Sequence, residues 1–108
     1  MSKVLRPRTR LFRVAKVDEI KPGHRKVVNI EGREIAVVNL NGRFYAMDNR
    51  CPHAGFPLTY APIYKGMIIC PNHGWMFSAD TGECKTNPSC RLKTYKVLTN
   101  GKYIKVEL

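Results

Sequence analysis

Residues 51–75 read CPHAGFPLTYAPIYKGMIICPNHGW, and this stretch contains the most informative pattern of the chain. Each end of it places a cysteine close to a histidine, as Cys51-Pro52-His53 and as Cys70-Pro71-Asn72-His73. The whole chain has 4 cysteines and 3 histidines, so two such pairs are not expected by chance. Two thiols and two imidazoles carried by two proline-containing loops can together bind a metal.

Two kinds of metal centre fit these four ligands, and buried thiols with structural histidines are the simplest alternative to both. A Cys₂His₂ zinc site usually pairs like ligands, as C-x₂₋₄-C and H-x₃₋₅-H. In this chain each loop offers one sulfur and one nitrogen. That mixed order favours a binuclear centre in which one iron takes both thiolates and the other takes both imidazoles.

The two boxes, residues 51–55 and 70–75, resemble those of the Rieske [2Fe–2S] family. The similarity covers roughly residues 10–108 and continues through Phe77, Asp80, Thr81, Gly82 and Pro88. The resemblance implies one cluster per chain, with Cys51 and Cys70 on the inner iron. It also implies that His53 and His73 bind the outer iron through Nδ1, with their Nε2 edges near solvent. Pro88 would then belong to a loop that caps the cluster.

The resemblance also bears on the reduction potential, which spans about −150 to +300 mV among Rieske centres. High-potential members have an extra cysteine in each box, joined as a disulfide, and hydroxyl groups beside the cluster. At the corresponding positions this chain has Phe56, Asn72, Trp75 and Phe77. We therefore expect a low-potential centre, nearer to about −150 mV than to about +300 mV.

The sequence around the boxes predicts β-strands. Alternating or β-branched runs indicate strands at 11–17, 26–30, 33–40, 43–48, 63–69, 75–78, 92–98 and 102–108, with one helical turn or a tight loop at 17–23. The dipeptides Asn41-Gly42 and Asn100-Gly101 predict tight hairpins, because type I′ turns need positive φ at both central residues. We expect an all-β fold: a Rieske-like antiparallel sandwich or barrel with a cluster-binding subdomain of two ligand loops.

A length of 108 residues suits one domain, which we place at residues 10–108 after a basic tail at 1–9. The net charge is +11, and residues 1–13 contain five cations and no acid. Solubility explains such a charge most simply, and acidic docking surfaces on protein partners come next. Nucleic acid is disfavoured, because aromatic side chains are not interleaved with the basic residues of the tail.

The remaining cysteines and histidine, and the residues next to the two boxes, are expected to have structural roles. Cys84 and Cys90, on either side of Pro88, are expected to be small buried thiols, with a disulfide as the alternative. We expect Trp75 to pack in the core and His24 to lie in an exposed loop. Asp48 and Asn49 are expected to hydrogen-bond the first loop.

No apolar run approaches the roughly 20 residues that span a bilayer. No export signal is visible at the N-terminus either. Together these observations predict a cytoplasmic protein without a membrane anchor.

The resemblance implies a soluble one-electron carrier and not an enzyme in its own right. Its donor would be a ferredoxin reductase, and its acceptor a terminal oxygenase or another reductase. With two histidines on the cluster, only His24 is left, so the chain cannot build the two-histidine, one-carboxylate iron site of an oxygenase. Two alternatives are a small Rieske subunit of a larger enzyme, such as an assimilatory nitrite reductase, and a redox-sensing or structural metal module.

Overall fold

The computed structural model describes residues 9–53 and 55–108, so Ala54 and all but one residue of the expected tail lie outside the described residues. The strands are β1 Leu11–Lys16, β2 Arg25–Ile30, β3 Arg33–Leu40, β4 Arg43–Asp48, β5 Ile63–Tyr64, β6 Met67–Ile69, β7 Met76–Ser78, β8 Thr94–Thr99 and β9 Tyr103–Glu107. A single 3-10 turn, η1 Val17–Glu19, follows β1. The expected all-β fold class is confirmed.

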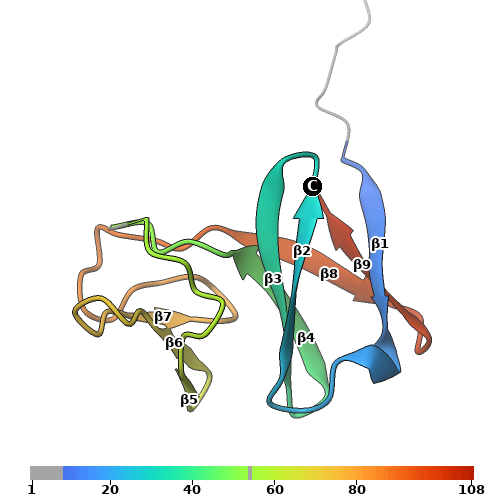
Figure 1. The fold of residues 1–108 in the computed structure, drawn as a ribbon, viewed down its shortest axis with the longest axis horizontal. Coiled ribbons are helices and arrows are strands. Elements are labelled where there is room, and N and C mark those ends of the chain that lie inside the picture. The colour runs from blue at the N-terminus through green and yellow to red at the C-terminus, as the bar shows by residue number, and fades with distance from the viewer. Residues whose placement is uncertain (1–8, 54) are drawn as a thin grey trace, which may run out of the picture.

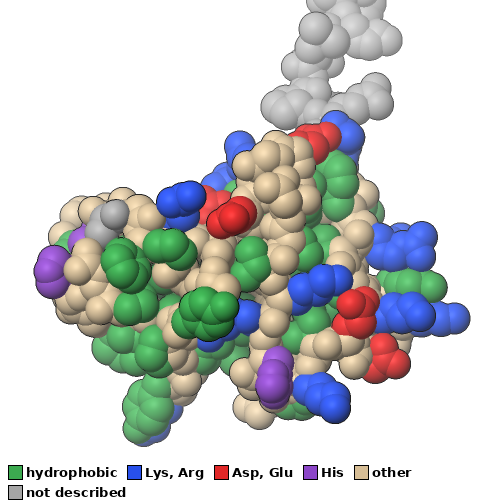
Figure 2. Space-filling model, viewed as in Figure 1, with side chains coloured by type: hydrophobic (Ala, Val, Ile, Leu, Met, Phe, Trp, Pro, Cys, Tyr) green, Lys and Arg blue, Asp and Glu red, His purple; other side chains and the backbone are tan. Residues whose placement is uncertain are grey.

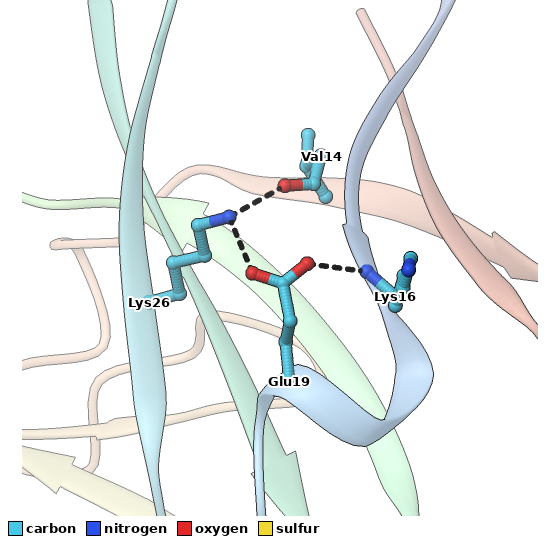
Figure 3. Close-up of polar contacts among 4 residues, drawn as sticks. All are labelled: Val14, Lys16, Glu19 and Lys26. Atoms are coloured by element: carbon cyan, nitrogen blue, oxygen red, sulfur yellow. Dashed lines mark hydrogen bonds and ion pairs between the residues drawn. The ribbon is translucent and has the colours of Figure 1, made fainter.

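Six strands form one antiparallel sheet in the order β1-β9-β8-β4-β3-β2, and it curls into a nearly closed barrel (Figure 1). The two edge strands are joined by side chains rather than by backbone pairing. Lys26 of β2 donates to the Val14 carbonyl of β1 at 3.1 Å and to the Glu19 carboxylate at 3.1 Å (Figure 3). These contacts satisfy polar groups at the edges of the open seam.

Strand β3 separates two hydrophobic cores, which explains its uninterrupted run of apolar residues. Side chains alternate between the two faces of a strand, so Ile35 and Val37 point into the barrel. Ala36 and Val38 point the other way, into a second core. All four are buried, and the part of a strand that is covered on both faces is expected to be apolar.

The second core lies between the barrel and a small sheet of order β5-β6-β7 (Figure 1). The sequence predicted one strand at 63–69, and that prediction is wrong. The chain turns at Lys65 and Gly66, whose φ angles are 50° and 76°, and forms the β5–β6 hairpin. The β5–β6 hairpin lies between the two ligand boxes in the chain, and β7 follows the second box.

Arg25 connects the barrel to the segment that follows the first box. From β2, its guanidinium donates to the Leu58 carbonyl at 2.6 Å and also to the Ala61 carbonyl. Burial lowers the pKa of Arg25 from its ordinary value, because it removes water from the charged guanidinium. The two carbonyls replace part of that lost hydration.

Candidate metal centre

The two ligand boxes fold into loops with the same hydrogen-bond pattern. The Cys51 amide donates to the Phe56 carbonyl at 2.7 Å, and the Cys70 amide donates to the Trp75 carbonyl at 2.8 Å. The fifth residue of each loop is a glycine whose amide returns to the cysteine carbonyl, at 2.6 Å for Gly55 and 3.0 Å for Gly74. Both glycines have positive φ, 67° and 70°, a conformation that favours glycine.

The sequence also contains a pattern that predicts two equivalent loops, which the Cys–His spacing alone does not reveal. Both loops match Cys-Pro-x-x-Gly followed by an aromatic residue, with Phe56 in the first loop and Trp75 in the second. The histidine occupies the third position of the first loop and the fourth position of the second. Two equivalent loops therefore present their imidazoles from different positions.

Three of the four expected ligands lie together. The ligand atoms of Cys51, His53 and Cys70 are all within 4.8 Å of one another. The Sγ atom of Cys51 is 2.6 Å from Nδ1 of His53, so the imidazole turns the expected ligand nitrogen toward the thiols. The side chains of Cys51 and Cys70 are fully buried, and both belong to the second core.

His73 lies beside this group but outside it. Its ring centroid is 6.1 Å from that of His53, and the two rings are inclined by 46°. The residue has a φ of 74° and is exposed to solvent. Its loop position one residue later places this imidazole at the surface of the site.

His53 has the opposite environment, and the expectation that both Nε2 edges lie near solvent is wrong for it. Its ring stacks on the Trp75 indole with the centroids 3.9 Å apart and the planes 6° from parallel. Its Nε2 atom is buried and has no hydrogen-bond partner among the described residues. Trp75 also packs against the second core, as the sequence predicted.

The residues before the first box divide between two roles. Asn49 supports the loop as expected. Its side-chain NH₂ group donates to Thr59 Oγ1 at 2.7 Å, and its backbone carbonyl accepts a hydrogen bond from the Leu58 amide at 3.1 Å. The expectation for Asp48 is wrong, because its carboxylate accepts a 2.5 Å hydrogen bond from Tyr95 in β8. The Asp48 side chain is therefore bound to the neighbouring strand β8 and not to the loop.

The segment around Pro88 contributes thiols that are not joined as a disulfide. Cys84 is buried in the second core and accepts a hydrogen bond from the Asn87 amide at 3.3 Å. Burial raises the pKa of the Cys90 thiol, and its neighbours Cys84 and Cys51 add to that effect. The expectation of small buried thiols holds for Cys84, whereas Cys90 is half-buried. Exposed His24 also matches its expectation.

The donor set fits an iron–sulfur centre. Thiolate and imidazole are the ligands of Rieske clusters, and the apolar second core around the two thiols is the kind of surrounding that controls solvent access to such a centre. Burying the Nε2 atom of His53 without a hydrogen-bond partner among the described residues costs free energy of folding. A metal-binding role for the other nitrogen accounts for keeping His53 there.

Comparison with known proteins gives the same family. The model of the Rieske [2Fe–2S] domain matches residues 10–96. The biphenyl dioxygenase ferredoxin subunit of Pseudomonas sp. (strain KKS102) is 30% identical over 93 residues, which cover 84% of this chain and 85% of that one.

Solved structures show the same fold. The ferredoxin of carbazole 1,9a-dioxygenase from Nocardioides aromaticivorans IC177 is 30% identical, with a TM-score of 0.81 over 89% of this chain and 95% of that one. A complex of oxidised ferredoxin with reduced oxygenase of carbazole 1,9a-dioxygenase contains a chain that is 27% identical (TM-score 0.79, 89% and 91% covered).

A Mycobacterium tuberculosis protein described as an NADH-dependent nitrite reductase small subunit has a TM-score of 0.85, over 94% of this chain and 97% of that one. At 21% identity that likeness concerns the fold alone. Among residues 9–53 and 55–108, the structure contains no helix long and apolar enough to cross a membrane. From its two boxes, its fold and its match over residues 10–96, this chain belongs to the family of Rieske domains, which bind a [2Fe–2S] cluster.

Proposed function

We propose that this chain is a ferredoxin-type one-electron carrier whose cluster is bound by Cys51, Cys70, His53 and His73. The observation that carries the proposal is the pair of equivalent loops, which brings Cys51, His53 and Cys70 within 4.8 Å of one another. When bound, the cluster accepts and releases one electron at a time. We take the cluster-binding domain to be residues 10–108.

The protein groups around the ligands have separate tasks in this proposal. The buried thiols of Cys51 and Cys70 anchor the inner side of the cluster in the apolar second core. Trp75 keeps the His53 ring in place and excludes water from one of its faces. His73, the exposed imidazole, is then the ligand through which an electron leaves toward a partner.

The named relatives support the choice of partners. Two of them are ferredoxins of dioxygenase systems, and one structure holds such a ferredoxin together with its oxygenase. We propose that this chain accepts electrons from a ferredoxin reductase and passes them to a terminal oxygenase, without catalysing a reaction alone. The alternative, a subunit of a nitrite reductase, is supported by a similarity of fold only. Cys84 and Cys90, which form no disulfide, suit the cytoplasm, where we place the protein.

Metal and sulfide analysis with EPR tests this function. We expect the purified protein to be brown and to contain two irons and two acid-labile sulfides per chain. An EPR signal should appear after reduction with dithionite and be absent before it. Its midpoint potential should lie below about +100 mV. A colourless protein with one zinc and no inorganic sulfide would contradict the proposal.

Ligand substitution tests the assignment of individual residues. Each of C51S, C70S, H53A and H73A should abolish the cluster, because each removes one bond to iron. The matched controls H24A and C90S should keep the iron content and the EPR signal, since neither residue is in the ligand set. A normal spectrum in any of the four ligand variants would remove that residue from the assignment.

A further inference from the structure

The outward side of strands β1, β9 and β8 forms a surface that the metal centre does not use. We call it the basic face and define it by nine residues: Leu11, Arg13, Lys16, Lys96, Leu98, Lys102, Tyr103, Lys105 and Glu107. The strand register places them together. Arg13 pairs with Lys105, and Lys105 pairs with Leu98 on the next strand.

The other pairs follow the same alternation. Leu11 lies opposite Glu107, which lies opposite Lys96. A register shift between Arg13 and Ala15 then brings Lys16 opposite Tyr103, on the same outward side. The intervening residues Phe12, Val14, Ile104 and Val106 belong to the barrel core. The pairing of the three strands therefore places these outward side chains next to one another on one continuous surface.

The positive charge of this face is not neutralised within the described residues 9–53 and 55–108. It holds five cations and one carboxylate, Glu107. The ion pairs of this part of the chain join Arg10 to Glu31 and Lys26 to Glu19, and neither includes a residue of the face.

Apolar side chains are exposed among these cations. Leu11 is 50% exposed and Leu98 is 39% exposed. Tyr103 does not offer its ring in the same way, because the Arg13 guanidinium lies 4.4 Å from its centroid and the Lys102 ammonium 5.8 Å from it. Stacking on nucleic-acid bases needs open aromatic faces, which this arrangement does not supply.

We propose that the basic face docks an acidic region of a partner protein. Carboxylates would pair with the cations, and aliphatic contacts would form at Leu11 and Leu98, as in an interface with an apolar centre and a polar rim. Strands β1 and β9, which carry most of the face, lie at the end of the barrel away from the β5–β7 sheet and the ligand boxes, and β8 runs across the barrel toward that end (Figure 1). Figure 2 shows Lys and Arg side chains gathered at that end of the molecule.

The position of the face determines what docking there can do. A partner held on β1, β9 and β8 leaves the metal centre uncovered. The contact therefore anchors the carrier while its exposed His73 remains available for electron exchange elsewhere on the same partner or on another protein. That consequence rests on the proposed function, whereas the docking itself does not require the cluster.

Binding of a fluorescently labelled oligo-glutamate peptide to the cluster-loaded protein tests the proposal. We expect R13Q/K96Q/K105Q to bind about tenfold more weakly than the wild type, since three exposed charge contacts are lost. The control R43Q/K65Q/K85Q removes the same charge from other surfaces and should bind within about threefold of the wild type. The variant R13K/K96R/K105R keeps the charge and should retain binding.

Two results would overturn the proposal. One is an equal loss of peptide binding in both charge-removal variants, which would show that net charge alone is sensed. The other is tighter binding of the wild type to a single-stranded oligonucleotide or to phosphatidylserine vesicles than to the peptide. The iron content and EPR signal of each sample report on the cluster separately. A failure of the proposed electron-transfer function is therefore distinguishable from a failure of docking.

Discussion

The stacking of Trp75 on His53 makes the two candidate imidazole ligands unequal. One ring is covered by the indole and has its Nε2 buried, while the ring of His73 is exposed. Parallel rings at 3.9 Å restrict rotation of the His53 side chain, so the indole acts as a positioning group for that ligand. Because the rings come from different loops, the contact also holds the two ligand loops together.

Replacing Trp75 tests this positioning role. W75A should lower the free energy of unfolding by about 1–3 kcal/mol, because it removes a half-buried ring and uncovers the imidazole. W75F keeps an aromatic ring and should lose less. The midpoint of guanidinium-induced bleaching of the cluster measures the effect. Equal midpoints for the wild type and W75A would show that the stack does not support the site.

The turn after β7 depends on a glycine for a steric reason. Gly82 has a φ of 81°, and a Cβ atom there would lie 2.0 Å from the carbonyl oxygen of Leu92. The close approach is part of the fold, since the Leu92 amide donates to the Gly82 carbonyl at 2.8 Å. This pairing connects the end of the small sheet to the segment that leads into β8.

Gly32 provides a matched control for Gly82. Its φ is 85°, but a Cβ atom there would have nothing within 4 Å. G32A should cost about 1–2 kcal/mol from the left-handed backbone alone. G82A should cost more than about 3 kcal/mol, because the collision adds to the same backbone term. Thermal unfolding followed by far-UV circular dichroism compares the two, and similar losses would rule out the collision.

Strand β2 holds the segment after the first ligand loop through Arg25. The guanidinium is the shared donor for two carbonyls of the segment that follows the loop. R25M keeps much of the side-chain length and removes both donors. We expect it to cost about 2–4 kcal/mol, because hydrogen bonds to charged groups contribute about 1.5–3 kcal/mol each and this group is partly exposed.

The control for R25M is R43M, which removes an exposed arginine from β4. Amide hydrogen exchange should become faster at residues 58–61 in R25M and stay unchanged there in R43M. Unchanged exchange in both variants would mean that the second core holds this segment without Arg25.

The barrel as a whole is closed by the polar seam between its edge strands (Figure 3). The Glu19 carboxylate accepts a hydrogen bond from the Lys16 backbone amide at 2.8 Å and one from the Lys26 ammonium. The hydrogen bond from the Lys16 amide contributes most to lowering the pKa of Glu19 from its ordinary value of 4.5, and the hydrogen bond from Lys26 adds to that effect. A lowered pKa means that the ionised carboxylate is favoured in the folded state.

The contribution of this seam to stability therefore depends on pH. It is fully present above the unfolded-state pKa near 4.5 and is lost as the pH falls through the lower folded-state value. We expect the wild type to be more stable than E19Q at neutral pH and this difference to shrink below pH 4.5. Guanidinium midpoints of both proteins at each pH measure it. A difference that does not change with pH would exclude the carboxylate as its source.

The ligand boxes and most strands could be predicted because the signals for them are local. Strands β3 and β4 have the predicted bounds, and the Asn41-Gly42 turn between them has the positive φ angles that a type I′ turn needs. Cysteine and histidine spacing predicted four candidate ligands, and the structure brings the ligand atoms of Cys51, His53 and Cys70 within 4.8 Å of one another. The turn at Lys65 and Gly66 was missed because apolar residues on both sides hide it within one β-branched run.

The amino-acid sequence by itself determined the candidate ligand types, the Asn41-Gly42 hairpin and the apolar run in β3, because these depend on neighbours a few residues apart. The tertiary structure alone decided that His53 is covered while His73 is exposed, that Arg25 reaches the segment after the first ligand loop, and that the cations of β1, β8 and β9 share one face. Each of these depends on segments far apart in the chain. Their approach is determined by the packing of two cores and the register of the sheet, which no local pattern encodes.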